Sequence, residues 1–333
     1  MPLERMDSVL DLGTLEAMTL ELANRIRAVV HPRLGEAESR AFTGTAIGGD
    51  ATLDIDREAE EVVAAFLEEE GNLAVFTEDL GLVTRGEPQA VLVVDPVDGT
   101  RPAAAGFESC CVSIAATRVI DSPVVDDVEV GVVRELKWDR TFWATRGNGM
   151  HIMGPAGELE EPRLSDATDT SSLFWAGGFR GRPYLPVAAS VAELADECSL
   201  RGSVFDLGSA SFIMTRILTG QLDAYLDPAL RLLDEYPGLE PEFLKTGGGF
   251  VLCNTPYDVS ASILLFEEAG AEVTDCHGRD LGSRSILGSD REHQMSSLAA
   301  ASPELHSTLL EVVDRGVARV GELWPELERA ELS

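Results

Sequence analysis

The chain has 333 residues, of which 44% are hydrophobic, and its formal net charge is −32. This length suits two subdomains or one large layered domain, and the apolar content excludes wholesale disorder. The acidic excess disfavours binding to nucleic acid or to an anionic membrane. No apolar run is long enough to span a bilayer and the first residues carry mixed charges, so we expect a cytoplasmic protein.

The cysteine and lysine contents are also informative. The five cysteines form no CxxC pair, which predicts neither a disulfide framework nor a zinc site, and we interpret them as buried thiols. Lysine occurs only at Lys137 and Lys245, while arginine is frequent. An acidic surface with little lysine fits a high-salt cytoplasm, where cations screen the repulsion. A GC-rich genome would also favour arginine, so both explanations stay open.

The first part of the chain predicts two helices separated by a glycine-rich loop. Apolar residues have helical spacing over 9–30, and this helix ends before His31-Pro32. The loop covers 44–49. The second helix begins near Asp56, keeps its apolar residues on one face and ends at Gly71. Asp56 could simply cap this helix.

Two predicted strands end in acidic residues. The short strand 73–76 precedes Glu78, and the apolar run 91–94, typical of a strand buried on both faces, precedes Asp95 and Asp98. Buried carboxylates this close repel one another, and Mg²⁺, which prefers oxygen ligands, removes that penalty. The alternative for the Asp-Gly and Pro residues here is an ordinary surface turn.

The rest of the chain mixes strands and helices. Strands are predicted at 110–116, 128–136, 140–146, 173–176, 204–207, 222–226 and 271–274, and helices at 187–198, 210–218, 259–269 and 302–332. The Gly-, Pro- and Glu-rich stretch 154–169 suggests a boundary, so we predict an N-terminal α+β subdomain over 1–160 and a C-terminal α/β subdomain over 161–333. Residues 228–256 are predicted to form a long irregular connection, which is usually functional or mobile.

The acidic motifs together resemble those of the inositol monophosphatase family of metal-dependent sugar-phosphate phosphatases. The family pattern is an early Asp before a helix, Glu-Glu at a strand end, Asp-Pro-Ile-Asp-Gly-Thr/Ser, and a late Trp-Asp whose helix runs into Glu-Ala-Gly. The matching residues here are Asp56, Glu78-Asp79, Asp95 to Thr100, Tyr257-Asp258 and Glu268-Ala269-Gly270. The chain most resembles the archaeal-type members, which often act on both inositol monophosphates and fructose 1,6-bisphosphate.

This resemblance implies a fold and a set of ligands. The fold is a layered αβαβα sandwich, commonly a homodimer, and the cofactor is Mg²⁺, two or three ions, with Mn²⁺ as a possible substitute. Glu78, Asp95 and the Val97 carbonyl would hold the first ion, and Asp95, Asp98 and Asp258 the second. The catalytic group would be Asp56 and Thr100, which orient the attacking water, together with Glu78.

Substrate contacts follow from the same matches. The amides of Gly99 and Thr100 would hold phosphate oxygens at a helix N-terminus. The other candidate contacts are Asp98, Ser209, Ala210 and Asp227. Asp227 could equally be a solvated acid at a strand end. Arg101, which departs from the family pattern, could reach a second phosphate or pair with one of the many acids, and we interpret Asp54 and Asp79 as supporting or solvated acids.

The predicted function is a Mg²⁺-dependent phosphomonoesterase that acts on a small phosphorylated metabolite, inositol monophosphate or fructose 1,6-bisphosphate. One alternative is a 3′-phosphonucleotide phosphatase, which needs an aromatic or apolar slot for a base, and the connection 228–256 could provide it. The other is a degenerate homologue that binds metal or a partner without turnover. The same connection could also act as a lid over the site.

Overall fold

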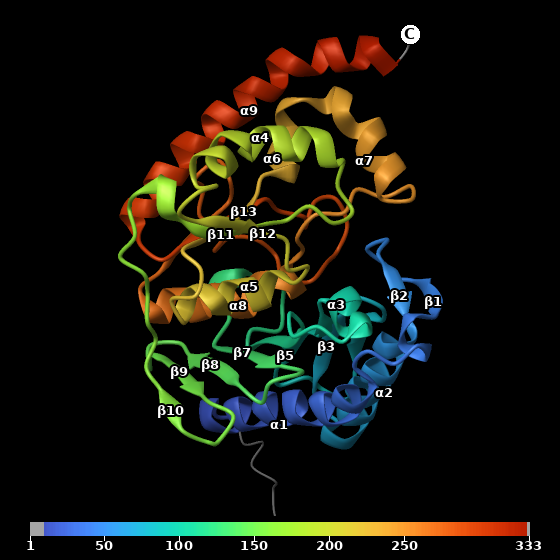
Figure 1. Ribbon diagram of the computed structural model, residues 1–333. Helices are drawn as coiled ribbons and strands as arrows, with labels where there is room; N and C mark the ends of the chain where they lie inside the picture. Colours follow the sequence, from blue (N-terminus) through green and yellow to red (C-terminus); the bar gives the residue numbers. More distant parts are fainter. Residues whose placement is uncertain (1–9, 332–333) are drawn as a thin grey trace, which may run out of the picture.

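The computed structural model describes residues 10–331, in which two large sheets and three helical layers stack in the order αβαβα, with a separate two-stranded hairpin at the edge (Figure 1). Helices α1 (Leu12–Val30) and α2 (Asp54–Glu70) cover the outer face of the larger sheet. Helices α5 (Ala210–Leu218) and α8 (Pro256–Ala269) lie between the two sheets. The predicted layered sandwich is confirmed.

The larger sheet has eight strands in the order β10-β9-β8-β7-β6-β5-β3-β4. Their bounds are β3 (Ala74–Thr77), β4 (Gly81–Thr84), β5 (Val91–Asp98), β6 (Cys111–Thr117), β7 (Val130–Glu135), β8 (Thr141–Thr145), β9 (Met150–Met153) and β10 (Leu159–Glu160). Strands β3 and β5 are parallel and the other neighbours are antiparallel. The parallel pair brings the carboxyl ends of β3 and β5 to the same edge.

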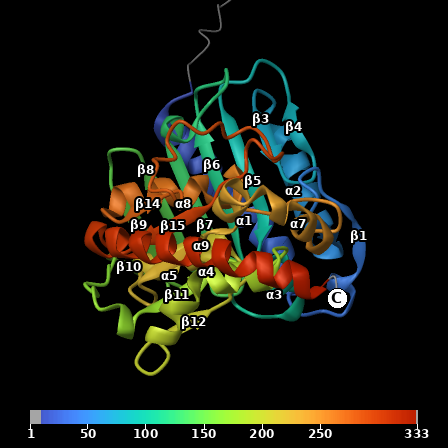
Figure 2. The ribbon, with the colours of Figure 1, turned by 90° about the horizontal axis from the view of Figure 1, so that it is seen from above.

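The smaller sheet has five strands in the order β12-β11-β13-β15-β14. Their bounds are β11 (Phe174–Gly177), β12 (Ser203–Phe205), β13 (Ala224–Asp227), β14 (Glu272–Thr274) and β15 (Ser297–Ala300). Helix α9 (Pro303–Glu331) packs across α4 (Tyr184–Glu197) on the outer side of this sheet, as the view from above makes clear (Figure 2). No helix within residues 10–331 is long and apolar enough to cross a membrane.

Strand β5 shows why the central layer forms. Val91 and Val93 contribute to the core between the two sheets, while Leu92 and Val94 contribute to the core under α1 and α2. Successive side chains of a strand point to opposite faces, so an unbroken apolar run fills both cores at once. The predicted burial of this strand on both faces is confirmed.

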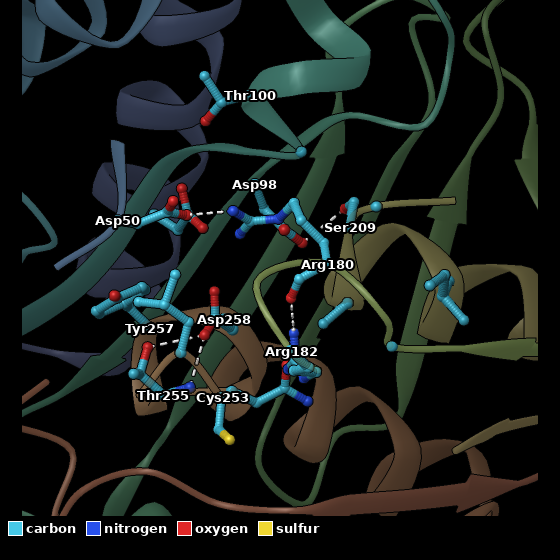
Figure 3. Close-up of a pocket in the computed structure, with 18 of the residues that line it drawn as sticks. Asp50, Asp98, Thr100, Arg180, Arg182, Ser209, Cys253, Thr255, Tyr257 and Asp258 are labelled. Atoms are coloured by element: carbon cyan, nitrogen blue, oxygen red, sulfur yellow. Dashed lines mark hydrogen bonds and ion pairs between the residues drawn. The ribbon is translucent and has the colours of Figure 1, made fainter. Parts of the chain in front are cut away.

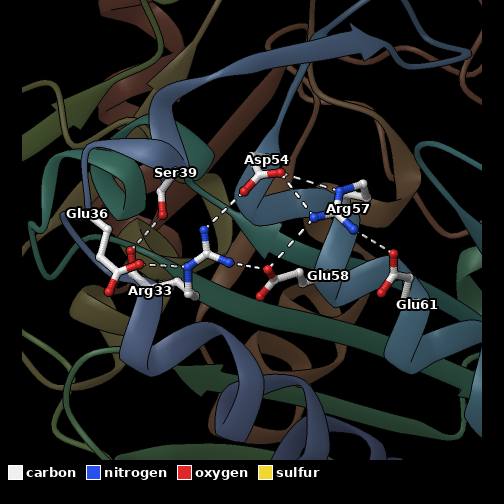
Figure 4. A network of polar contacts seen from close by, with 7 residues as sticks. All are labelled: Arg33, Glu36, Ser39, Asp54, Arg57, Glu58 and Glu61. Carbon is white, nitrogen blue, oxygen red and sulfur yellow. Dashed lines mark hydrogen bonds and ion pairs between the residues drawn. The ribbon is translucent and has the colours of Figure 1, made fainter.

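The start of α2 is fixed by a network of ion pairs at the surface (Figure 4). Arg33, which follows α1, pairs with Glu36 at 2.8 Å, with Asp54 at 3.0 Å and with Glu58. Arg57 pairs with Asp54 at 3.1 Å within the first turn of α2. Asp54 therefore belongs to this network, which holds the helix that carries Asp56.

The prediction of an irregular connection over 228–256 is wrong. This stretch contains α6 (Ala229–Glu235), a 3₁₀ helix (Pro237–Leu239) and α7 (Glu240–Thr246). Leu239 and Phe243 are fully buried beneath the outer helices, so the segment has apolar anchors. Helices of about two turns, interrupted by proline, are too short to produce a clear apolar period. Short strands were missed for the same reason, including the hairpin β1 (Phe42–Thr45) and β2 (Ala51–Leu53).

Two further predictions concern the cysteines and the subdomains. All five cysteines are free, and four are buried while Cys253 is partly exposed. The division into 1–160 and 161–333 stays a prediction. The larger sheet ends with β10 at Glu160, yet α5 and α8 from the second half pack on that same sheet.

Candidate active site

The site begins with an irregularity in β5. Asp95 pairs with Ser113 and Asp98 with Cys111 on β6, so β5 carries one more residue than its partner between these points. In a regular strand, residues three apart point to opposite faces, and a bulge of one residue reverses that relation. The two carboxylates therefore converge instead of diverging.

The turn after β5 requires a glycine. Gly99 has φ +89°, and a Cβ there would lie 2.5 Å from the Ser109 carbonyl oxygen and 2.9 Å from the Ser209 Cβ. The tight turn starts α3 (Thr100–Ala105) directly after the acidic strand end. The Thr100 hydroxyl donates to the Val97 carbonyl at 3.1 Å, which keeps the side chain on the side of the carboxylates.

Two of the acids are fixed by helix N-termini. The Thr255 amide and hydroxyl donate to Asp258 Oδ2 at 2.6 and 2.8 Å, within the capping box of α8. The Ser209 hydroxyl and the Ser211 amide, at the start of α5, both donate to Asp98 Oδ2 at 2.7 Å. Both inner helices therefore aim their first turns at the end of β5.

The result is a cluster of carboxylates, of which Asp95 and Asp98 are buried while Glu78 and Asp258 are half-buried. One oxygen from each of Asp95, Asp98 and Asp258 lies within 4.8 Å of the others. Burial raises the pKa of Asp95 well above its usual value, and the charges of Asp98 and Glu78 raise it further. Burial and the charges of Asp50 and Asp258 do the same to Glu78. A buried, mutually repelling set of oxygen donors fits a hard divalent cation, which would neutralise the repulsion.

A second small cavity adjoins this cluster behind Asp95. Its lining includes Asp56, Glu60 and Glu78. The Leu53 amide donates to Asp56 Oδ2 at 2.7 Å, so Asp56 does close the first turn of α2. Burial nevertheless raises the pKa of Asp56 to about 7, against hydrogen bonds from Leu53 and Thr100 that lower it. Asp56 thus lies near Thr100, from which it is far apart in the sequence, while the Thr100 hydroxyl donates to the Val97 carbonyl.

An arginine that the sequence analysis did not single out faces the acids. Arg180, in the loop between β11 and α4, pairs with Asp50 at 2.6 Å, and its guanidinium points to that carboxylate in Figure 3. Burial alone would raise the pKa of Asp50, but Arg180 and Arg101 lower it below its usual value. Arg180 lines the same cavity as Asp95, Asp98 and Asp258. It is therefore a cation placed where an anionic ligand would enter.

Of the two roles considered for Asp227, the structure contradicts the solvated acid and leaves the substrate contact untested. It is fully buried at the end of β13 and pairs with Arg182, whose Nε lies 3.1 Å from Asp227 Oδ1. The suggestion of a solvated acid is wrong, because Arg182 and the turn after β13 cover the carboxylate. Arg182, and not Asp227, lines the cavity. A substrate contact by Asp227 stays a prediction that would act through Arg182.

The other predicted residues fall into two groups. Those that line the carboxylate cavity are Glu78, Asp95, Val97, Asp98, Gly99, Thr100, Ser209, Ala210 and Asp258. Arg101 lies outside it, with its guanidinium 3.4 Å from Asp50 and about half exposed. Of the two supporting acids, Asp79 accepts from the Thr52 hydroxyl at 2.7 Å. The structure thus brings together residues from β3, β5, α3, α5 and α8, and their roles stay predictions.

Sequence reasoning missed Asp50, Arg180 and Arg182. A local signal existed, because two arginines alternate with glycine directly after a predicted strand that ends at Gly177-Gly178. Arginine beside glycine in such a loop is typical of anion binding. The partner of each arginine could not be identified, since Asp50 and Asp227 are far from them in the sequence.

Comparisons with known proteins agree with this geometry. A model of the inositol monophosphatase family matches residues 11–307. The fructose-1,6-bisphosphatase/inositol-1-monophosphatase of Methanothermobacter thermautotrophicus is 23% identical over 314 residues, which cover 91% of this chain and 98% of that protein. The bifunctional NADP phosphatase/NAD kinase of Methanococcus maripaludis is 25% identical over 79% of this chain and 44% of that protein. A solved inositol monophosphatase–fructose 1,6-bisphosphatase has the same fold, with a TM-score of 0.67 and 18% identity over 89% of this chain and 98% of that one.

Proposed function

The chain belongs to the inositol monophosphatase family, as its acidic motifs predicted, and on this premise we propose that it is a Mg²⁺-dependent phosphomonoesterase. Its substrate would carry the phosphate on a hydroxyl of a small sugar or polyol. The observation that carries this proposal is the triad of Asp95, Asp98 and Asp258, whose oxygens lie within 4.8 Å of one another in a buried cavity. Such a triad is costly unless a cation neutralises it.

The residues divide into two metal-binding sets. Glu78, Asp95 and the Val97 carbonyl would hold one ion, and Asp95, Asp98 and Asp258 would hold another, with Mn²⁺ as a possible substitute for Mg²⁺. When bound, these ions supply Lewis-acid stabilisation of the phosphoryl group and of the leaving oxygen. The all-oxygen donor set supports Mg²⁺ over softer metals.

The chain's own residues position the attacking water and the phosphate. Asp56 would accept the Thr100 hydroxyl proton in place of the Val97 carbonyl, which is its acceptor in the structure, and the hydroxyl oxygen would then orient the water. The amides of Gly99 and Thr100 would donate to phosphate oxygens. Arg180 would add a charged donor from the loop between β11 and α4. This arrangement supports direct attack by water, without a phosphorylated enzyme.

Inositol monophosphate and fructose 1,6-bisphosphate are the first substrates to test. The archaeal relatives named as fructose-1,6-bisphosphatase/inositol-1-monophosphatase support them, and Arg101 would be near enough to the cavity to meet a second phosphate. All the acidic residues of the family motifs are present, and this argues against a homologue that has lost catalytic activity. A homodimer and a cytoplasmic location stay predictions.

The experiment is phosphate release from a panel of sugar, polyol and nucleotide phosphates, with Mg²⁺ and with a chelator. We expect turnover only with the metal. Asp95→Asn should lower kcat roughly a thousandfold or more, equivalent to about 4 kcal/mol of transition-state stabilisation. Asp196→Asn is the matched control, because Asp196 is an exposed acid near the end of α4 and does not line the cavity. Metal-independent turnover, or full activity of Asp95→Asn, would refute the proposal.

A further inference from the structure

A second cavity opens directly beside the catalytic cavity, between α3 and the β7–β8 hairpin, and we call it the hollow beside α3. Its lining includes Phe107 and Trp138. The two cavities share three residues, which are Arg180, Asp206 and Gly208. These three residues form the junction through which the alcohol part of a phosphate ester would extend away from the carboxylate cluster.

Asp206 is a solvent-accessible acid in the segment that joins β12 to α5. Partial burial at the cavity wall raises the pKa of its carboxyl above the usual value, while the charges of Arg182 and Arg180 lower it. Both arginines line the catalytic cavity, but they pair with Asp227 and with Asp50. Among residues 10–331 the Asp206 carboxylate itself forms no ion pair. It is therefore an acceptor at the cavity wall that a ligand can reach.

The backbone after Asp206 fixes where its carboxylate lies. Gly208 has φ +72°, and a Cβ there would lie 3.1 Å from the Pro102 Cγ of α3. One residue further on, Ser209 caps α5 and donates to Asp98 Oδ2 at 2.7 Å (Figure 3). Asp206 is thus three residues from a side chain that touches the carboxylate cluster, a span of at most roughly 10 Å of chain. That span suits the alcohol part of a small ester whose phosphate lies at the cluster.

The charges at the junction favour a neutral group over a second anion. Asp50 pairs with Arg180 at 2.6 Å and with Arg101 at 3.4 Å. Asp50 and Asp206 together therefore offset the two arginines, which leaves no net positive charge to attract a second phosphate. A hydroxyl can donate to the Asp206 carboxylate, whereas a phosphate beside it would be repelled.

We propose that Asp206 determines substrate specificity, because its carboxylate accepts hydrogen bonds from hydroxyl groups of the substrate and disfavours a second phosphate at the junction. The inference rests on the proposed function and deepens it. Within that function it names polyol monophosphates as the favoured substrates over sugar bisphosphates. A hydrogen bond to a charged acceptor is roughly twice as strong as a neutral one, so a single carboxylate can separate the two classes.

Two variants separate the two parts of this proposal. Asp206→Asn keeps an acceptor oxygen and loses the charge, whereas Asp206→Ala loses both. Asp196→Asn, at an exposed acid outside both cavities, is the matched control. The value of kcat/KM is measured with Mg²⁺ for inositol 1-phosphate, for fructose 1,6-bisphosphate and for propyl phosphate, whose alcohol part has no free hydroxyl.

The expected changes differ between substrates. Asp206→Ala should lower kcat/KM for inositol 1-phosphate roughly tenfold or more, because a hydrogen bond to a charged group is lost. The same variant should leave propyl phosphate unchanged, which also shows that the fold is intact. Asp206→Asn should raise kcat/KM for fructose 1,6-bisphosphate roughly tenfold relative to inositol 1-phosphate, since it removes the repulsion. Asp196→Asn should match the wild type for all three substrates.

Two results would overturn the inference. An equal loss for inositol 1-phosphate and propyl phosphate in Asp206→Ala would show that Asp206 supports the phosphate site or the fold and does not contact hydroxyl groups. An unchanged ratio between the bisphosphate and inositol 1-phosphate in Asp206→Asn would show that its charge does not select between the two classes.

A binding measurement separates this inference from the proposed function. Inositol 1-phosphate is titrated by calorimetry into the wild type and Asp206→Ala with Ca²⁺, which also binds oxygen ligands, in place of Mg²⁺. If no phosphomonoester is hydrolysed but Asp206→Ala still raises the Kd, the proposed function is wrong and the hydroxyl contact stands. If the wild type hydrolyses phosphomonoesters and Asp206→Ala changes neither kcat/KM nor Kd, the inference alone is wrong.

Discussion

Arg180 and Arg182 are the two cationic residues, within the described part of the chain, that line the carboxylate cavity, and they differ in what they contact. Arg182 is occupied by the buried Asp227, while Arg180 pairs with Asp50 at the edge of the cavity. Because Asp50 is partly exposed and Arg180 about two-fifths exposed, an anionic ligand can compete for this guanidinium. Arg180 is therefore the residue through which an acidic protein could admit an anion to an acidic site.

Replacing Arg180 tests this idea. Arg180→Ala should raise KM for a phosphomonoester roughly tenfold or more, because a charge-assisted hydrogen bond to the phosphate is lost. Arg180→Lys should recover part of the loss, since it restores the charge and not the planar fork. Steady-state kinetics with saturating Mg²⁺ gives both values. An unchanged KM in Arg180→Ala would place this arginine outside substrate binding.

At the scale of elements, the segment between β13 and α8 contacts the hairpin β1–β2. The ring of Phe250, which follows α7, lies so close to Gly49 that a Cβ on Gly49 would be 2.2 Å from it. Gly49 also has φ +97°, so this turn accepts a side chain poorly on two grounds. Since the same turn carries Asp50, the position of α7 is coupled to the partner of Arg180.

This coupling gives the lid hypothesis a specific form. Phe250→Ala should raise KM several-fold and speed proteolysis within the hairpin, because the turn that holds Asp50 loses its packing. Leu244→Ala, on the exposed side of α7, is the matched control. Limited proteolysis and steady-state kinetics measure the two effects. If Phe250→Ala matches the wild type in both, the segment does not control the site.

For the lid hypothesis, the single substitution Phe250→Ala is a better test than deletion of residues 237–248. That deletion would remove Leu239 and Phe243, which are fully buried. Loss of one buried phenylalanine alone costs about 3–5 kcal/mol of unfolding free energy. A lower activity after the deletion would therefore reflect instability as much as the loss of a lid.

At the scale of the whole molecule, buried acids make the metal-free protein sensitive to pH. Burial raises the pKa of Asp56 and of Glu60 to about 7, from ordinary values of 3.8 and 4.5. Between those ordinary values and about pH 7, the folded protein binds more protons than the unfolded chain. The unfolding free energy should therefore fall as pH rises through this window.

Thermal unfolding in the presence of a chelator tests whether stability falls or rises with pH. The Tm of the metal-free protein should fall between about pH 5 and about pH 7.5, and Asp56→Asn should flatten the curve. Saturating Mg²⁺ should raise Tm most at the higher pH, because the ligands are then ionised. A Tm that rises with pH without metal would contradict the buried, protonated state of these acids.

The net charge of −32 predicts a salt dependence of the whole fold. Repulsion among surface acids destabilises the compact state, and KCl should raise Tm by screening it. A neutral osmolyte at matched osmolality separates screening from general exclusion of solute. If Tm does not rise in molar KCl, a high-salt cytoplasm does not explain the acidic composition.

The sequence by itself determined the central strand, the order of the acidic motifs and the fold family. Each of these depends on neighbours along the chain. Alternate residues of 91–94 must enter two cores, Gly99 must allow a tight turn, and Asp258 completes the capping box in the first turn of α8. Local patterns also indicated that Glu78 and Asp95 would lie close together, because each of them follows the carboxyl end of a predicted strand.

The tertiary structure alone decided which charges are paired and which surfaces are hollow. Arg180 could have met any of many acids, and only the fold brings Asp50 to it and encloses Asp227 behind Arg182. The hollow beside α3 likewise combines Phe107 with Trp138 and Phe205, from three segments that share no local pattern. The physical reason lies in the separation of the interacting residues along the chain. Helix and strand patterns arise from contacts between residues a few positions apart. Ion pairs and cavities arise from contacts between distant residues, which form only when the layers pack.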